Sequence, residues 1–285
     1  MFQTILIGYD EPERGGEATA LAETLRDPHT GTLVLSSVYP PAPLPVGRFV
    51  GPQDVELLRE QAEEMLLMAR DALPDRDRVM IRAIPSDSAA RVLSEVAEAE
   101  QADLVVVGSS RRSALGRLLP GTTAERLLHD APCPVAVAPR GYSGGDIRRI
   151  GVAYDGSPEA EAALQAAEAL ALELRAALTV YCVVEPSSRQ GARDLLQEVA
   201  ADAPAGIRPE WLLLHGVPAT EIAGRAYGVV DLLFVGSRGY GPLRHALLGN
   251  VSGALVRAAG CPVVVTPRIA IAPHRARGIA TEANA

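Results

Sequence analysis

Short apolar runs alternate with longer segments whose apolar residues recur at helical spacing over most of the chain. In the second half the apolar runs are continuous, which is typical of parallel strands covered on both faces. The strands expected there are 150–154, 179–184, 211–215, 231–236 and 262–267. The expected helices are one that follows Ser157-Pro158, then 191–200, 219–228 and 250–258. This alternation predicts a doubly wound α/β domain.

The first of these helices has a clear start and a clear apolar face. Ser157 is a suitable N-cap, and Pro158 suits the first helical position because its missing N–H would have no partner there. Apolar side chains then recur at helical spacing at Leu164, Ala167, Ala171, Leu174 and Leu178.

The first half of the chain repeats this plan. ILIGYDEPE (5–13) matches IGVAYDGSP (150–158) at an offset of 145, whereas ADLVVVGSS (102–110) matches VDLLFVGSR (230–238) at 128. APCPVAVAPR (131–140) also matches AGCPVVVTPR (259–268) at 128. The first copy is therefore longer by 17 residues, which we place after its second strand.

The repeat predicts two tandem doubly wound, Rossmann-like domains, each with a five-stranded parallel sheet. We expect them at residues 1–142 and 147–270, with a hinge at GYSGGD (141–146) and a flexible tail at 271–285. The extra residues of the first copy, within 40–60, carry prolines at 40, 41, 43 and 45 and predict an irregular loop. A lid, a partner surface and a plain surface insertion all fit this loop.

Composition removes several classes of function. The net charge is −8, which argues against binding to nucleic acid or to an anionic membrane. All 27 basic residues are arginine, so neither a Walker lysine nor a Schiff-base lysine is available. Cys133, Cys182 and Cys261 form no CxxC pair, and the five histidines lack metal-site spacing. The N-terminus does not resemble a signal peptide, and no apolar run is long enough for a membrane helix, so we expect a cytoplasmic protein.

The unusual residues gather where ligands bind in open parallel sheets, at the carboxyl ends of the strands. Asp10 and Asp155 end the first strand of each copy, and Gly108 and Gly236 end the fourth. Glycine-containing loops then lead into helices, whose free N–H groups favour an anion such as phosphate. The candidate anion ligands are Ser109, Ser110, Gly121, Thr122 and Thr123 in the first copy and Ser237, Arg238, Gly239, Gly249, Asn250 and Ser252 in the second.

A purely structural explanation of these loops stays open. Thr122 with Glu125 forms a capping box, and Asn250 is a suitable N-cap. The glycines would then only bend the chain between a strand and a helix.

Both copies resemble the universal stress protein family. Its nucleotide-binding members carry G-x2-G-x9-G followed by Ser or Thr. The second copy keeps this spacing in Gly236, Gly239 and Gly249 but has Asn250 at the hydroxyl position. The first copy has Gly108 and Gly121-Thr122, with Arg111 in place of the second glycine. The resemblance implies an adenine nucleotide alpha hydrolase-like fold, with the adenine contacts of the family at Asp10 and Val38, and at Asp155 and Val183.

The resemblance thus implies one binding site in each copy, and we expect the C-terminal site to be the stronger because Arg111 disturbs the first loop. The C-terminal site comprises Ala153, Tyr154, Asp155, Val183, Val235, Gly236, Arg238, Gly239, Gly249, Asn250, Val251 and Ser252. The N-terminal site comprises Asp10, Val38, Gly108, Ser110, Arg111, Gly121, Thr122 and Thr123.

The expected function is that of a stress-response or signalling regulator that binds ATP or another adenine nucleotide, with Mg²⁺ as a companion ion of the phosphates. We expect no true enzyme, because no second acid or water-positioning residue accompanies Asp155. Two alternatives stay open, a non-nucleotide-binding interaction module of the same fold and a slow ATP hydrolase. The family resemblance also implies that strands 134–139 and 262–267 pair within the chain, and it leaves a homodimer open.

Overall fold

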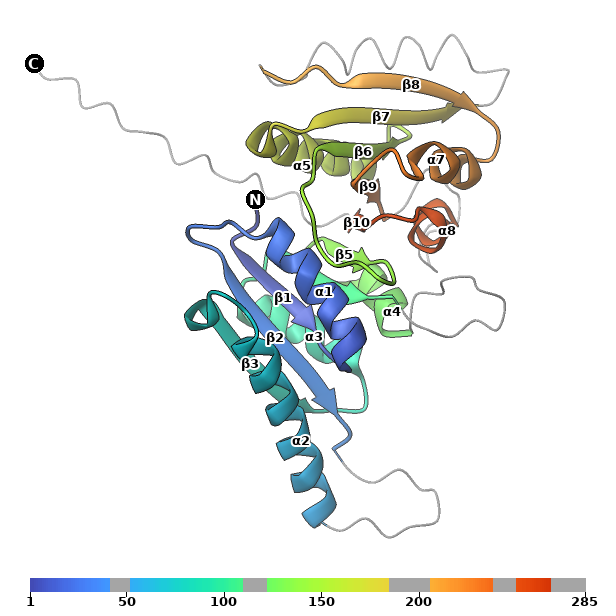
Figure 1. Ribbon diagram of the computed structural model, residues 1–285. Helices are drawn as coiled ribbons and strands as arrows, with labels where there is room; N and C mark the ends of the chain where they lie inside the picture. The colour runs from blue at the N-terminus through green and yellow to red at the C-terminus, as the bar shows by residue number, and fades with distance from the viewer. Residues whose placement is uncertain (42–51, 110–121, 185–205, 238–249, 268–285) are drawn as a thin grey trace, which may run out of the picture.

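The computed structural model describes residues 1–41, 52–109, 122–184, 206–237 and 250–267, except for the side chains of Pro52, Gln53, Thr122, His129, Asp130 and Asn250. Within these residues, ten strands form a single sheet in the order β3-β2-β1-β4-β5-β10-β9-β6-β7-β8 (Figure 1). The predicted helix 191–200, residues 42–51 of the proline-rich insertion and the predicted tail 271–285 lie outside the described residues. Residues 52–60 of the insertion belong to a helix, so the expected irregular loop does not extend over them.

The N-terminal half contributes the first five strands in this order. Its strands are β1 (Thr4–Gly8), β2 (Thr32–Tyr39), β3 (Val79–Pro85), β4 (Leu104–Gly108) and β5 (Val135–Ala138). Its helices are α1 (Pro12–Leu25), α2 (Pro52–Asp71), α3 (Ala89–Ala99) and α4 (Thr122–Asp130), with the 3₁₀ turn η1 (Arg76–Arg78). The strands within this half are all parallel.

The C-terminal half repeats the arrangement. Its strands are β6 (Arg149–Tyr154), β7 (Ala177–Val184), β8 (Glu210–His215), β9 (Leu232–Gly236) and β10 (Val263–Thr266), again all parallel to one another. The described helices are α5 (Pro158–Leu174), α7 (Pro218–Ala226) and α8 (Asn250–Ala258). The predicted fold class of two doubly wound five-stranded units is confirmed.

The start of α5 was predicted correctly, and its end was not. The Ser157 side chain accepts a hydrogen bond from the Ala160 backbone N at 3.2 Å, and Pro158 opens the helix. The helix stops at Leu174 because Arg175 adopts a left-handed backbone with φ of 54°. Leu178 therefore lies in β7 rather than on the apolar face of the helix.

The two halves join through β5 and β10, which pair antiparallel in the middle of the sheet. Val264 lies opposite Ala136, and Val263 lies opposite Val137. This confirms the predicted pairing within the chain. Because this ladder makes the two parallel sheets continuous, each half covers the sheet edge that the other would expose.

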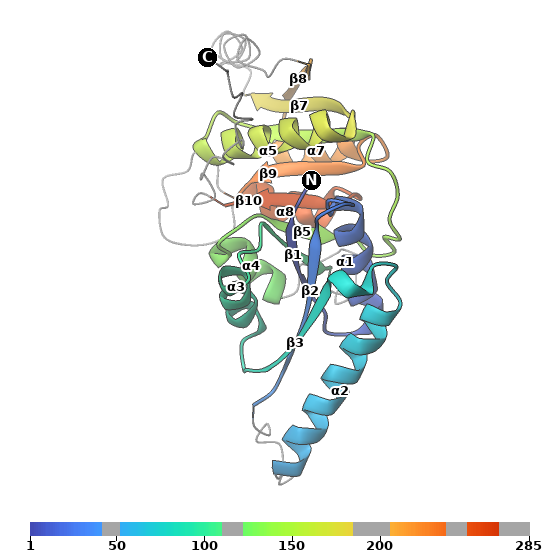
Figure 2. The same cartoon turned by 90° about the vertical axis from the view of Figure 1, so that its left-hand side faces the viewer.

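Helices cover both faces of the sheet (Figure 2). Two apolar layers lie between the sheet and these helices, one on each face. Residues of α3, α4, α7 and α8 form one layer together with Val135 and Val263. Residues of α1, α2 and α5 form the other together with Ala136 and Val264. Each layer contains residues from both halves, so hydrophobic burial as well as backbone pairing holds the halves together.

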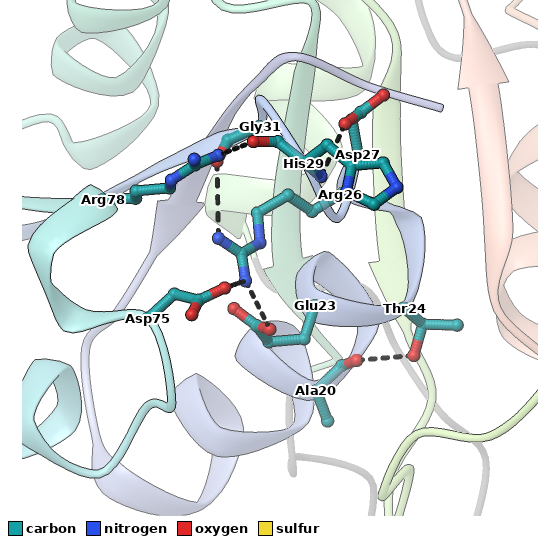
Figure 3. A network of polar contacts seen from close by, with 9 residues as sticks. All are labelled: Ala20, Glu23, Thr24, Arg26, Asp27, His29, Gly31, Asp75 and Arg78. Carbon is teal, nitrogen blue, oxygen red and sulfur yellow. Dashed lines mark hydrogen bonds and ion pairs between the residues drawn. The ribbon is translucent and has the colours of Figure 1, made fainter.

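A buried arginine fixes the end of α1 in the N-terminal half (Figure 3). Arg26 is 4% exposed, and its Nη2 lies 3.0 Å from Glu23 Oε2 and 2.9 Å from Asp75 Oδ2. Its Nη1 also donates to the Gly31 carbonyl oxygen at 3.3 Å. The guanidinium therefore ties α1 to the turn before β2 and to the segment before β3, at the end of the sheet away from the predicted ligand site.

Candidate functional site

A cavity of about 290 Å³ opens at the carboxyl ends of β1 and β4 in the N-terminal half. The strand order reverses at this point, because β2 lies on one side of β1 and β4 on the other. Such a switch point is where open α/β sheets bind ligands. The cavity is lined by Gly8, Tyr9, Asp10, Arg14, Ser36, Val38, Ala89, Leu93, Val107, Gly108, Thr123 and Ala124.

The structure brings four of the predicted N-terminal site residues together around this cavity, namely Asp10, Val38, Gly108 and Thr123. They come from the ends of β1, β2 and β4 and from the first turn of α4, which the chain separates widely. Ser110, Arg111 and Gly121 lie outside the described residues, as does the side chain of Thr122.

Sequence reasoning missed the residues that form the walls and floor of the cavity. Leu93 enters from α3, Arg14 enters from the first turn of α1, and Ser36 lies two residues before Val38 on the same strand face. The alternation of side chains along a strand was a usable signal for Ser36. Leu93 had no such signal, because its approach depends on how α3 packs on the sheet.

Ser36 places a buried hydroxyl against the cavity. It is 1% exposed, and its Oγ has no hydrogen-bond partner among the described residues. A buried hydroxyl without a partner is uncommon, and it destabilises the fold by roughly 1–3 kcal/mol. The cavity therefore has a polar group at its floor that a ligand can satisfy.

Asp10 and Arg14 place opposite charges at the mouth of the cavity. Arg14 Nη2 lies 2.7 Å from Asp10 Oδ2, and Arg14 Nε lies 2.8 Å from Glu11 Oε1. Burial raises the pKa of Asp10 above its ordinary value, although the Arg14 guanidinium acts in the opposite direction. The three side chains thus form one ion-paired cluster, in which the charge of the guanidinium is balanced by the two carboxylates.

Gly108 and Gly236 have a packing role that is independent of any ligand. A Cβ on Gly108 would lie 2.6 Å from the Arg14 carbonyl oxygen, and one on Gly236 would lie 2.7 Å from the Glu159 carbonyl carbon. Both distances are far below van der Waals contact, so the first glycine of each loop is needed where a helix start crosses the end of the fourth strand. Close packing is therefore sufficient to explain why glycine stands at positions 108 and 236. The later glycines of the motif lie outside the described residues.

In the C-terminal half, the structure places Ala153, Val183, Val235 and Val251 in one apolar layer, on the face covered by α7 and α8. Tyr154 lies in the opposite layer, where its hydroxyl is 3.1 Å from Glu161 Oε2 and its ring meets Trp211 edge to face. Arg238, Gly239 and Gly249 lie outside the described residues, as does the side chain of Asn250.

Two polar residues predicted for the C-terminal site already have partners in the protein. The Ser252 hydroxyl is 1% exposed and donates to the Ser237 carbonyl oxygen at 3.2 Å, which tethers α8 to the end of β9. Asp155 is exposed, and its Oδ1 accepts a hydrogen bond from the Ser157 backbone N at 3.0 Å. Both residues therefore also stabilise the local fold.

Three other kinds of site concern metal ions, membranes and reactive thiols within the described residues. In that part of the chain, no group of three or more His, Cys, Asp or Glu side chains is placed to hold a metal ion. None of the helices described is long and apolar enough to cross a membrane. Cys133, Cys182 and Cys261 are buried free thiols, and burial raises the pKa of Cys133 and of Cys261 to about 12.

Known proteins share both the repeat and the fold. The model of the universal stress protein family matches the chain twice, at residues 1–139 and 146–267. A universal stress protein of Mycolicibacterium smegmatis is 29% identical over 290 residues, which cover 93% of this chain and 97% of that protein. A single-domain universal stress protein of Thermus aquaticus is 29% identical over 137 residues, covering 47% of this chain and 97% of that protein.

A solved structure shows the same two-domain architecture. The crystal structure of a universal stress protein from Archaeoglobus fulgidus superposes with a TM-score of 0.73 at 21% identity, covering 93% of this chain and 98% of that chain. The fold and the strand-end crevice thus define a tandem, doubly wound α/β protein. The chain belongs to the universal stress protein family.

Proposed function

We propose that this chain binds an adenine nucleotide in the strand-end cavity of its N-terminal half and that occupancy of the cavity regulates a stress response. The observation that carries the proposal is the convergence of Asp10, Val38, Gly108 and Thr123 on one cavity. Its volume of about 290 Å³ lies near the lower end of the range for small-molecule sites.

Each part of the cavity suits a different part of a nucleotide. Val38, Leu93 and Val107 supply apolar walls for a flat base, and the Asp10 carboxylate can accept a hydrogen bond from an exocyclic amino group. The phosphates would lie toward Thr123 in the first turn of α4, where free backbone N–H groups favour anions. Mg²⁺ would accompany the phosphates, as it does for ATP in most proteins.

The sequence favoured the C-terminal half, whereas the described geometry supports the N-terminal half. The helix residue that crosses Gly108 is Arg14, a cation, whereas the residue that crosses Gly236 is Glu159, an acid. Arg14 is already paired with Asp10 and Glu11, so its charge does not by itself decide between the halves, and the case for the N-terminal half is the cavity. The preference between the halves is therefore open to a direct test.

The first experiment is to measure the nucleotide content of the purified protein by denaturation and ion-exchange chromatography. The matched variants are Asp10→Ala and Asp155→Ala, which alter equivalent strand ends in the two halves. We expect equimolar ATP in the wild type and in Asp155→Ala, and loss of ATP in Asp10→Ala. Loss in Asp155→Ala alone would assign the site to the C-terminal half.

A further outcome decides against the proposal altogether. A wild-type protein that carries no nucleotide, and whose melting temperature does not change with added ATP and magnesium, does not bind ATP. The family fold would then act as an interaction module through its surfaces. Turnover of added ATP by the wild type, lost in Asp10→Ala, would instead favour the slow hydrolase.

A further inference from the structure

The floor of the N-terminal cavity is formed where β1 and β2 pair. Ser36 lies opposite Gly8 in the parallel ladder, and both residues line the cavity. Because Gly8 has no side chain, Leu93 and Val107 approach this pair closely, since a Cβ on Gly8 would lie 3.1 Å from each of them. The Ser36 hydroxyl is buried there, and none of the described residues forms a hydrogen bond with it.

We propose that the Ser36 hydroxyl recognises the nucleobase of the bound nucleotide by hydrogen bonding to a polar atom on the edge of the ring; this rests on the function proposed above. The hydroxyl can donate or accept, and ring nitrogens and amino groups offer both kinds of partner. The walls beside it, Val38, Leu93 and Val107, are apolar and suit a flat ring rather than a phosphate. Binding would satisfy a group that the free protein leaves unpaired.

In the C-terminal half, a large aromatic side chain stands at the position equivalent to Ser36. Ala153 lies opposite Tyr181 at the ladder position where the N-terminal half has Gly8 opposite Ser36. Tyr181 is 1% exposed, and its Cε2 lies 3.0 Å from the point where a Cβ on Gly151 would be. At the position equivalent to Gly151, the N-terminal half has the buried Leu6.

Because Tyr181 stands in place of Ser36, we expect the two halves to differ in how they recognise a base. In the C-terminal half the Tyr181 ring packs over Gly151, where the other half has Leu6, and Tyr181 itself stands where the other half has Ser36. The base-recognising hydroxyl therefore belongs to the N-terminal half, and the chain is expected to recognise one base rather than two.

The test compares Ser36→Ala with Thr266→Val by isothermal titration calorimetry with ATP and with adenosine. Thr266 is the matched control because its Oγ1 is also buried and unpartnered but does not line the cavity. We expect Ser36→Ala to weaken both ligands by roughly tenfold, since the lost hydrogen bond belongs to the base. Thr266→Val should bind both ligands like the wild type.

A melting curve of each free protein separates recognition from folding. Ser36→Ala should melt at or above the wild-type temperature, because it removes an unsatisfied buried hydroxyl. Unchanged affinity in Ser36→Ala would overturn the inference while leaving the proposed function intact. A loss confined to ATP, with adenosine unaffected, would also overturn it, because the hydroxyl would then serve the phosphates. A wild type that binds neither ligand would overturn both the inference and the proposed function.

Discussion

Asp231 binds Arg149 twice, since its Oδ2 accepts from the Arg149 backbone N at 2.9 Å and its Oδ1 accepts from the guanidinium Nη2 at 2.7 Å. Asp231 Oδ2 also accepts from the Arg148 backbone N at 3.0 Å. The N-terminal half repeats the backbone contacts, because Asp103 accepts from the backbone N of Gln3 and of Thr4. In each half an aspartate at the start of the fourth strand thus positions the start of the first.

Replacing Asp231 should destabilise the fold in a pH-dependent way. Partial burial acts to raise the pKa of Asp231, but the hydrogen bonds from Arg149 and the backbone outweigh it and leave the pKa below its ordinary value. Its contribution is therefore present above the unfolded pKa of about 4 and is lost as pH falls through the folded pKa. Asp231→Ala should lower the free energy of unfolding at pH 7 by about 1–3 kcal/mol, as measured by urea denaturation.

Arg149→Ala is the control for this prediction, because it keeps both backbone hydrogen bonds and removes only an exposed guanidinium. It should cause a much smaller loss of stability. Equal losses in the two variants would show that the surface ion pair, rather than the backbone contacts, carries the effect.

Gly108→Ala and Gly236→Ala should each destabilise the protein by about 1–3 kcal/mol, because a methyl group would meet the backbone of the crossing helix. Gly16→Ala and Gly224→Ala are matched controls in the two halves, since a Cβ on either would meet nothing within 4 Å. Both controls lie inside helices and should stabilise by about 0.5–1 kcal/mol. Thermal denaturation of the four variants measures this, and neutral behaviour of Gly108→Ala would contradict the packing role.

Val264→Pro should unfold the protein or separate its halves. Val264 is fully buried and lies in β10, which pairs with β5 on one side and β9 on the other. Proline removes a ladder donor, and it is found in sheets only on edge strands, at the first residue of a strand or at bulges, not in the middle of a central strand. Val264→Ala keeps the N–H group and should remain folded with a lower melting temperature. Unchanged melting of Val264→Pro would show that this ladder does not hold the halves together.

Glu168 should make stability fall as pH rises toward neutrality. Burial, with a smaller effect from Glu161, raises the pKa of Glu168 from 4.5 to about 7. The folded state therefore binds more protons than the unfolded state between these values, so the free energy of unfolding decreases as pH rises across that window.

Glu168→Gln should remove this slope. It should raise the free energy of unfolding at pH 8 by roughly 1–3 kcal/mol and leave it unchanged at pH 4. Urea denaturation at both values measures the difference, with the exposed Glu98→Gln on α3 as the control. A variant that is less stable than the wild type at pH 8 would show that the charged carboxylate has a stabilising partner.

The sequence alone determined the repeat and the fold class, and the family resemblance implied the pairing of the last strands of the two halves. Parallel strands buried on both faces read as continuous apolar runs, and the Ser157-Pro158 start of α5 is a local signal that tertiary contacts did not need to supply. Changes of pattern at strand ends and helix starts indicated Asp10, Gly108 and Thr123, and the family resemblance added Val38; the structure places all four around one cavity. The extension of the α5 face to Leu178 was wrong, since one left-handed residue ends a helix whatever the apolar spacing beyond it.

Only the tertiary structure decided what these residues do to one another. It showed that Gly108 and Gly236 stand against the backbone of a crossing helix, a contact between segments far apart in the chain. It also showed that Leu93 lines the N-terminal cavity and that the Tyr181 ring packs over Gly151. Such complementarity depends on the distance between packed elements, and a pattern along one chain segment carries no information about the volume that another segment leaves open.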